Sequence, residues 1–107
     1  MTDVDELDIK PSSTKIITIN SLISFRLRES FYISLEYYDD EIIAWHYDTE
    51  SYASGKIEFE AIEGLKNELE DLFKYLINTP DEELCPRIQR WKKLLLYALV
   101  ESKFEHF

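Results

Sequence analysis

The chain has 107 residues, of which 45% are hydrophobic and 14% aromatic, a composition that excludes a disordered protein and predicts one domain with a buried core. Its 22 acidic residues outnumber its 12 basic residues, and the net charge of −10 argues against nonspecific nucleic-acid binding because phosphate groups are repelled. The same charge complements a basic protein partner.

Cysteine content and hydropathy point to a cellular location. Cys85 is the only cysteine, so an intrachain disulfide is excluded, and no Cys/His cluster supplies the ligands of a structural zinc site. The N-terminus lacks the basic flank and apolar run of a secretory signal, and no segment has the roughly 18 apolar residues that span a bilayer. We therefore expect a cytoplasmic protein with no cofactor and no contact with a membrane.

The first 28 residues divide into a lead-in and a strand. Residues 1–14 are acidic and polar and include Pro11, so they predict a flexible acidic lead-in to a single domain over residues 15–107. Apolar residues recur at 16–19, and residues 22–28 then alternate apolar and polar side chains with the two-residue period of a half-buried strand. This alternation predicts the first long strand of a sheet.

An antiparallel meander is predicted to continue from this strand. Residues 29–30 form a short connection, so the alternating segment 31–38 is expected to pair with the strand before it. The acidic turn at 38–41 returns the chain into an apolar strand over 42–48, and residues 48–54 are interpreted as a polar loop. The side chains expected on one face of the 31–38 strand are Phe31, Ile33, Leu35 and Tyr37.

The strongest local signal is a helix over residues 60–76. Its apolar residues recur at the three- and four-residue spacing of one helix face. The residues on that face are Ile62, Leu65, Leu69, Leu72 and Leu76. Asn78 is expected to end the helix. Thr79, Pro80 and Glu82 then have the pattern of a capped start, which predicts a short second turn.

The last predicted element is a helix that begins at Pro86, a residue suited to the first helical position, and continues through residues 87–104. One apolar stripe of this helix comprises Ile88, Trp91, Leu95, Ala98 and Leu99, and Leu94, Leu96 and Tyr97 widen it. We expect this C-terminal helical extension, over 80–105, to lie between the domain and a second subunit.

The predicted elements together define the fold class. We expect an α+β protein in which an antiparallel meander of about three to four strands packs against an amphipathic helix, with an additional C-terminal helix. No internal repeat and no low-complexity tract interrupts the chain, and 2 Gly and 3 Pro punctuate it. The strands and the first helix therefore form the predicted core, to which the C-terminal helix is added.

Residues 31–76 place two strands, a loop, a glycine and a helix in that order. Within them, residues 55–66 read Gly-Lys-Ile-Glu-Phe-Glu-Ala-Ile-Glu-Gly-Leu-Lys. This order and this segment resemble the HicB-type antitoxin domain, a small and partly degraded RNase-H-like fold. The elements shared with the family pattern are Gly55, Glu60, Ala61, Glu63, Leu65 and Lys66. Ile57 stands where the family has a threonine that caps the helix.

The resemblance implies a HicB-like core over 22–77 and an antitoxin-like protein that neutralises a basic, RNA-cleaving toxin. Many members of the family also carry a DNA-binding segment, where this chain offers a basic cluster within a helix. That cluster comprises Arg87, Arg90, Lys92 and Lys93. Because Glu82 and Glu83 precede the cluster, we interpret it as a salt-bridged helix surface, and nucleic acid is not expected as a direct ligand.

Partner binding is the function that the charge and the aromatic strands favour. Trp45, Tyr47, Tyr37 and Tyr38 form an aromatic cluster on neighbouring strands. Strand alternation is expected to place Tyr32 and His46 on the face away from Tyr37 and Trp45. The candidate partner-binding residues are Tyr32, Glu36, Tyr38, Asp39, Asp40, Glu41, His46, Asp48 and Glu50. We also expect a homo-oligomer, a dimer or higher, that forms through the C-terminal helix or a sheet edge.

Two alternatives stay open at this point. One is a small metal-dependent hydrolase that uses the acids of the 39–41 turn with His46, since hard cations prefer several carboxylates in an oxygen-rich loop. The other is an acidic immunity or adaptor protein of unrelated ancestry. No nucleophile with a base and an orienting group emerges from the pattern, so no catalytic, cofactor-binding or metal-binding residue is assigned. For His46 we favour a hydrogen-bonded structural role, and for Cys85 an ordinary reduced thiol.

Overall fold

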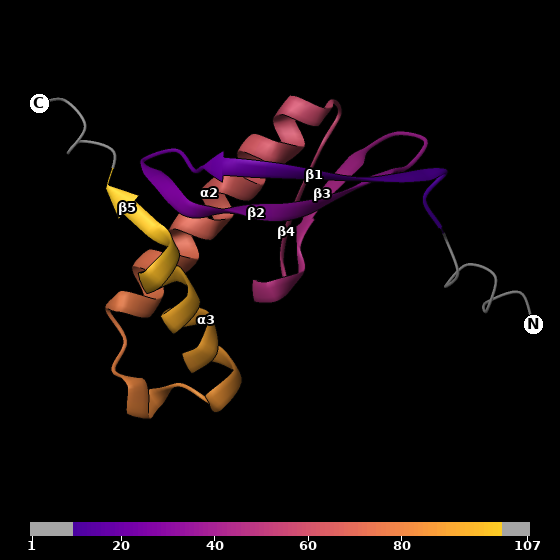
Figure 1. Cartoon of the computed structure of the whole chain (residues 1–107). Helices are drawn as coiled ribbons and strands as arrows, with labels where there is room; N and C mark the ends of the chain where they lie inside the picture. The colour runs from indigo at the N-terminus through magenta and orange to yellow at the C-terminus, as the bar shows by residue number, and fades with distance from the viewer. Residues whose placement is uncertain (1–9, 102–107) are drawn as a thin grey trace, which may run out of the picture.

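An antiparallel sheet and two helices make up the computed structural model, which describes residues 10–101 (Figure 1). The strands are β1 (Ser13–Ser21), β2 (Phe25–Tyr37), β3 (Ile42–His46), β4 (Ser51–Gly55) and β5 (Leu99–Glu101). The helices are α2 (Glu58–Ile77) and α3 (Pro86–Ala98), and the short 3-10 helices are η1 (Tyr47–Thr49) and η2 (Asp81–Glu83). The sheet order is β1-β2-β3-β4, and β5 pairs with β2. The predicted α+β class is confirmed.

The first hairpin turns earlier than the sequence pattern indicated. β2 runs without a break from Phe25 to Tyr37, so the predicted connection at residues 29–30 is wrong. The turn lies instead at residues 22–24, where the backbone N–H of Ser24 donates to the carboxylate of Glu70 on α2. Glu70 is 46 residues away in sequence and buried, which explains why a local pattern could not reveal this turn.

A fourth strand replaces the loop predicted at residues 48–54. β4 pairs antiparallel with β3 from Ile42 opposite Gly55 to His46 opposite Ser51. The connection between them contains η1 and then Glu50, whose φ of 56° makes it the one non-glycine residue with a positive φ within residues 10–101. The tight reversal at Glu50 allows the β3–β4 hairpin to form without glycine or proline.

Helix α2 forms where the three- and four-residue spacing predicted a helix. It starts after Ile57, which makes no side-chain capping hydrogen bond, in agreement with the missing threonine. It ends at Asn78 as expected, and the Asn78 side chain donates to the carbonyl oxygen of Lys74 at 2.8 Å. Its buried apolar residues, Ala61, Leu65, Leu69 and Leu76, face β3 and β4.

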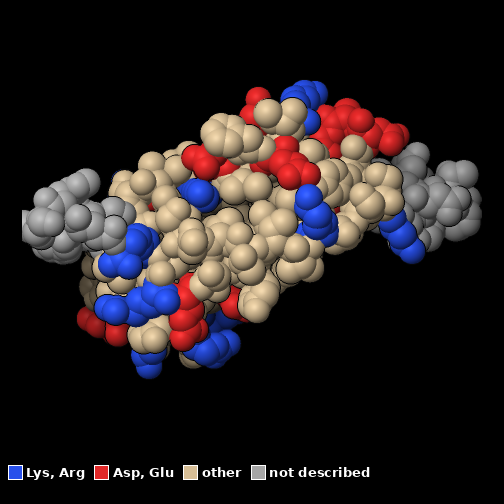
Figure 2. Space-filling view, turned by 45° about the horizontal axis from the view of Figure 1, so that its top comes forward, with Lys and Arg blue, Asp and Glu red and all other residues tan. Residues whose placement is uncertain are grey.

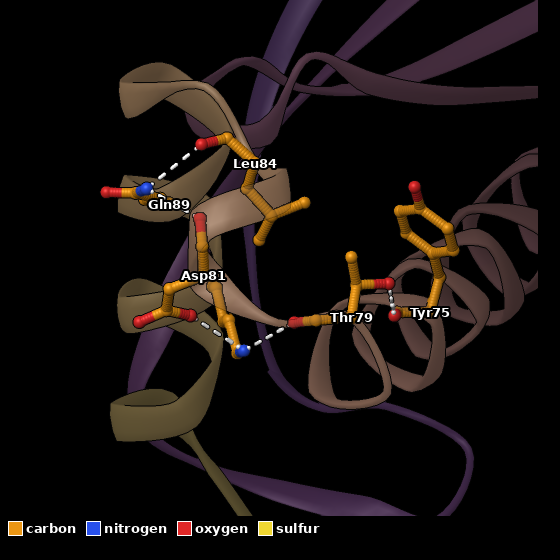
Figure 3. A network of polar contacts seen from close by, with 6 residues as sticks. Tyr75, Thr79, Asp81, Leu84 and Gln89 are labelled. Carbon is orange, nitrogen blue, oxygen red and sulfur yellow. Dashed lines mark hydrogen bonds and ion pairs between the residues drawn. The ribbon is translucent and has the colours of Figure 1, made fainter.

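The connection between α2 and α3 is fastened by side chains from α3 (Figure 3). Lys92 Nζ donates to the carbonyl oxygen of Thr79 at 2.9 Å and to Asp81 at 2.8 Å, while Gln89 donates to the carbonyl oxygens of residues 81 and 84. Thr79 does not cap the next turn as predicted, because its hydroxyl donates back to the carbonyl oxygen of Tyr75 at 2.7 Å. These bonds fix α3 relative to the end of α2.

Helix α3 begins at Pro86 as predicted but is shorter than expected. It ends at Ala98, and the chain continues as β5, in which Leu99 lies opposite Leu27 of β2. The prediction that the helix continues to residue 104 is wrong, because burial of Leu99 and Leu27 against each other favours an extended backbone there. Residues 102–107, like residues 1–9 of the predicted lead-in, lie outside the described part of the chain.

The hydrophobic core lies between one face of the sheet and the two helices. We call this face of the sheet the inner face. Ile33 and Leu35 of β2 are fully buried against Leu65 and Leu69 of α2 and Leu95 of α3. Phe31 is also buried and Tyr37 is half-buried, so the predicted alternation of β2 is confirmed. Within residues 10–101, no helix has both the length and the apolar character needed to cross a bilayer.

Candidate functional site

The second face of the sheet carries the candidate site, and we call it the open face. Side chains alternate between faces along each strand, and the register assigns ten residues to the central part of this face. They are Thr14, Ile16, Thr18, Tyr32, Ser34, Glu36, Ile43, Trp45, Tyr52 and Ser54. Arg26 and Arg28 continue the face toward the end of β2 that pairs with β5. Ile16 is 61% exposed, Tyr32 73% and Tyr52 56%, so neither helix covers this face.

Aromatic rings pack side by side on the open face. The ring of Trp45 lies 4.7 Å from that of Tyr52 on β4. It also stacks on Tyr47, which follows β3, with centroids 5.6 Å apart and planes 10° apart. Such stacked rings bring a large apolar area to the surface in a fixed orientation.

One carboxylate holds this aromatic group together. Glu36 accepts hydrogen bonds from Trp45 Nε1 at 3.0 Å, from the hydroxyl of Tyr38 at 3.0 Å and from the hydroxyl of Tyr47 at 3.2 Å. A carboxylate has enough lone pairs to accept all three, and its charge strengthens each bond. Desolvation, followed by the hydrogen bond to Glu36, raises the pKa of Tyr38 above its ordinary value. We call Glu36, Tyr38, Trp45, Tyr47 and Tyr52 the aromatic platform.

Acidic residues lie at both ends of the aromatic platform. Asp39, Asp40 and Glu41 are exposed in the turn between β2 and β3, and Asp48 and Glu50 are exposed in the connection between β3 and β4. Figure 2 shows a dense acidic group beside the grey residues at the right of the view, Lys and Arg side chains gathered toward the left, and a mostly uncharged expanse over the middle. The structure therefore brings the predicted acids to two ends of a surface with an apolar centre.

His46 does not belong to this surface. It is 2% exposed on the inner face, and its ring stacks on Phe31 with centroids 4.3 Å apart. Its Nδ1 forms a 2.7 Å hydrogen bond with Oγ1 of Thr49, which confirms the structural role favoured from the sequence. Desolvation lowers the pKa of His46, and the charge of Asp48 opposes this in part.

The predicted division of residues between the two faces is therefore wrong. Tyr37 lies directly opposite Ile42 in the register, so the odd-numbered residues of β2 share a face with the even-numbered residues of β3. This register places Tyr37 with His46 on the inner face. Tyr32 shares the open face with Trp45.

Trp45, Tyr47 and Tyr52 of the aromatic platform are not among the candidate partner-binding residues. The predicted aromatic cluster includes Trp45 and Tyr47 but not Tyr52. The segment Ser51–Gly55 has five residues, most of them small or polar, and it gave no strand signal that could assign Tyr52 to a face. Only the pairing of β4 with β3 brings Tyr52 beside Trp45.

The residues of the alternative hydrolase are not brought together. The acids of the 39–41 turn precede β3 and His46 ends it, so a whole strand separates them, and the histidine is buried. Within residues 10–101, no group of three or more His, Cys, Asp or Glu side chains is placed to hold a metal ion. Part of the basic cluster on α3 is salt-bridged as predicted, since Arg87 pairs with Glu50 and Lys92 with Asp81.

Comparison with known proteins adds no family to this description. The chain matches no protein-family model, no curated protein and no solved structure. Function must therefore be inferred from the surfaces themselves. Chemically, the aromatic platform offers stacked rings, three tyrosine hydroxyls and flanking carboxylates, a combination that suits non-covalent recognition.

Proposed function

We propose that this chain is a non-catalytic protein-binding module that docks a basic protein partner on its open face. One observation carries the proposal: the aromatic platform, ordered by Glu36, lies on a sheet face that neither helix covers. Following the resemblance to HicB-type antitoxins, the partner we propose is an RNA-cleaving toxin, and the place of action is the cytoplasm.

The aromatic platform has the properties of an interface centre. Burying apolar surface stabilises a complex by about 25 cal/mol for each Å², and aromatic residues dominate the centres of protein interfaces. The three hydrogen bonds to Glu36 restrain the rings before a partner arrives. Less side-chain entropy is then lost on binding than with freely rotating rings.

The charges around the platform favour a basic partner. Carboxylates stand at both ends of the aromatic platform, and the chain as a whole carries a net charge of −10. Opposite charge raises the rate of encounter and rejects acidic proteins and nucleic acids. A toxin that cleaves RNA needs a cationic surface for phosphate groups, and an acidic module that covers this surface would block it.

Capture experiments with matched variants test this function. A wild-type bait and a Tyr32→Glu bait are compared in an extract of the source organism, and Phe59→Glu, which alters a 68% exposed aromatic residue at the start of α2, serves as the control. We expect wild type and Phe59→Glu to enrich the same protein with an isoelectric point above about 9, and Tyr32→Glu to lose it. Equal capture by all three baits would contradict docking on the open face.

Co-expression tests the antitoxin assignment separately. A basic partner identified by capture is expressed alone and together with this chain, and growth is measured. We expect the partner to arrest growth when alone and the wild-type chain to restore it, while Tyr32→Glu fails to do so. A partner that leaves growth and cellular RNA unaffected would remove the toxin assignment and leave an acidic adaptor.

We also propose that the chain self-associates through β1. This strand is at one end of the sheet order, and Lys15 is its one charged residue among nine. Unpaired edge strands with little charge readily pair with a further strand. We expect light scattering to report a dimer or a higher oligomer for wild type, and a monomer for Ile16→Lys. The control Ile77→Lys, at an exposed position that ends α2, should leave the mass of wild type.

A further inference from the structure

A pocket of about 590 Å³ lies where the η1–β4 segment meets α2 and α3. Its aromatic walls are Tyr52, Tyr75 and Trp91, and its carboxylates are Glu50, Glu68 and Asp71. Tyr52 also belongs to the aromatic platform, so the pocket and the platform both border β4.

The aromatic walls come from elements whose relative position is fixed. Tyr75 lies near the end of α2 and Trp91 lies in α3, on either side of the connection that Lys92 and Gln89 fasten (Figure 3). Tyr75 is 60% exposed, so its ring faces are accessible to a ligand. Rings held in this way offer electron-rich faces to a cation without a rearrangement of the backbone.

The carboxylates of the pocket differ in whether they have an ion-pair or hydrogen-bond partner. Glu50 pairs with Arg87 at 3.2 Å, whereas the side chains of Glu68 and Asp71 form no ion pair or hydrogen bond with any residue of the 10–101 segment. Glu68 and Asp71 stand three residues apart on α2, so their side chains are neighbours on its surface. Two adjacent like charges repel each other, and a cation between them relieves that repulsion.

The contacts of Arg87 show how two residues that line the pocket, Trp91 and Glu50, bind a guanidinium group. Its guanidinium carbon lies 5.5 Å from the ring centre of Trp91 while its Nη1 contacts the carboxylate of Glu50. Aromatic stacking and carboxylate pairing are thus satisfied at once by one planar cation. The pocket repeats the same two components, rings and carboxylates, on the other side of Glu50, with Tyr75 beside Asp71 and Glu68.

We propose that this pocket binds the guanidinium group of an arginine side chain that the basic partner supplies. The inference rests on the proposed function and names the chemistry by which the partner is recognised. A guanidinium fits better than an ammonium ion because its plane stacks on a ring while its N–H groups pair with a carboxylate in a bidentate manner. Anions are excluded by the carboxylates.

Titration with a small probe tests the pocket without a partner. N-acetyl-arginine methylamide is added to the ¹⁵N-labelled full chain, and amide and indole shifts are followed by NMR. We expect saturable shifts centred on residues 68, 71, 75 and the indole of Trp91. N-acetyl-citrulline methylamide has the same shape without the charge, and we expect at least tenfold weaker binding. Absence of localised shifts, or equal binding of the two probes, would overturn the inference.

Two variants identify the groups responsible. We expect the double change Glu68→Gln and Asp71→Asn to weaken arginine binding at least tenfold, and Tyr75→Leu to weaken it several-fold. All three positions are exposed, so the fold should be retained. The control, Glu82→Gln with Glu83→Gln, removes the same charge from η2 and should bind as wild type. Equal weakening in the control would show that net charge, and not the pocket, attracts arginine.

The outcome separates this inference from the proposed function. If arginine does not bind but capture still depends on Tyr32, the pocket inference fails and docking on the open face stands. If arginine binds in the pocket but no basic protein is captured through Tyr32, the pocket stands and the docking proposal fails. The two experiments use different residues and different probes, so neither result can be mistaken for the other.

Discussion

The two faces of the sheet are built from similar side chains but have different surroundings. The inner face contributes Ile33, Leu35 and Ala44, all fully buried under the helices. The open face contributes Ile16 and Tyr32, which are more than half exposed, although Tyr32 stands between the buried Phe31 and Ile33 on the same strand. Hydrophobicity alone therefore does not decide which face becomes the core.

Helix α2 decides the difference between the faces. Its apolar stripe can cover one face of the sheet, and the chain between β4 and α2 directs it to the inner face. Neither α2 nor α3, the two α-helices of residues 10–101, lies on the open face. What remains there is a mixed apolar and polar surface whose aromatic rings are held in order by hydrogen bonds to Glu36.

The largest contrast between the faces should appear when one large side chain is removed from each. Leu35→Ala empties a fully buried position of the inner face, and we expect it to lower the free energy of unfolding by about 2–5 kcal/mol. Tyr32→Ala on the open face should change it by no more than about 0.5 kcal/mol. Urea unfolding followed by circular dichroism measures both. A large loss with Tyr32→Ala would mean that the open face is part of the core.

The sequence predicts those features of the two faces that depend on neighbouring residues, and it misses those that depend on contacts between residues far apart in the chain. The apolar spacing of α2, the alternation of β2 and the start of α3 at Pro86 are local signals, and all three are confirmed. The turn at 22–24 depends on Glu70, and β5 depends on contact with Leu27, so neither has a local signal. Long-range contacts of this kind override local patterns.

The candidate site shows the same limit. Tyr32, Glu36 and Tyr38 could be chosen because strand 31–38 was recognised, but the face of His46 depends on the number of residues in the turn that follows. A change of one residue in that turn reverses which side chains of β3 face the core. The sequence also contains no sign that Glu36 would accept hydrogen bonds from three aromatic residues, one in the β2–β3 turn, one on β3 and one in η1.

Close packing gives the inner face a further vulnerability at Gly55. A Cβ atom there would lie 2.5 Å from Cβ of Glu60 and 2.7 Å from the backbone nitrogen of Ala61. We expect Gly55→Ala to destabilise the fold by about 1–3 kcal/mol, because β4 and α2 must move apart. Gly64→Ala is the control, since its 3.0 Å contact with Ala53 is offset by a gain in helix propensity of about 1 kcal/mol. Similar losses in both variants would contradict the steric explanation.

The open face should respond to a change in its one organising carboxylate. We expect Glu36→Gln to lower the free energy of unfolding by about 1 kcal/mol, since charge-assisted hydrogen bonds are replaced by weaker ones. The near-ultraviolet circular dichroism of Trp45 should weaken, because its ring orientation depends on the bond to Glu36. Glu41→Gln removes the same charge from the adjacent turn and should leave this spectrum unchanged. An unaltered spectrum in Glu36→Gln would show that packing alone orders the platform.

Mild acid should act on the inner face and spare the open face. Burial lowers the pKa of His46 in the folded chain below its ordinary value of about 6.5. The unfolded chain therefore binds a proton first, and stability, complete above about pH 6.5, is lost as the pH falls from there to the lowered pKa. His46→Gln should remove this dependence, measured by urea unfolding between about pH 7 and pH 5 in a background that also carries His106→Gln.

The open face has the opposite dependence because its titrating group is a phenol. The pKa of Tyr38 is raised, so the folded chain retains the phenolic proton longer than the unfolded chain does. Stability that depends on this proton is complete below about pH 10 and is lost as the pH rises beyond it. As the pH falls from 7 to 5, we expect the near-ultraviolet circular dichroism of the aromatic platform to stay constant while the free energy of unfolding of wild type decreases. If the spectrum of the platform changed in step with the titration of His46, the two faces would be coupled and could not be treated as separate surfaces.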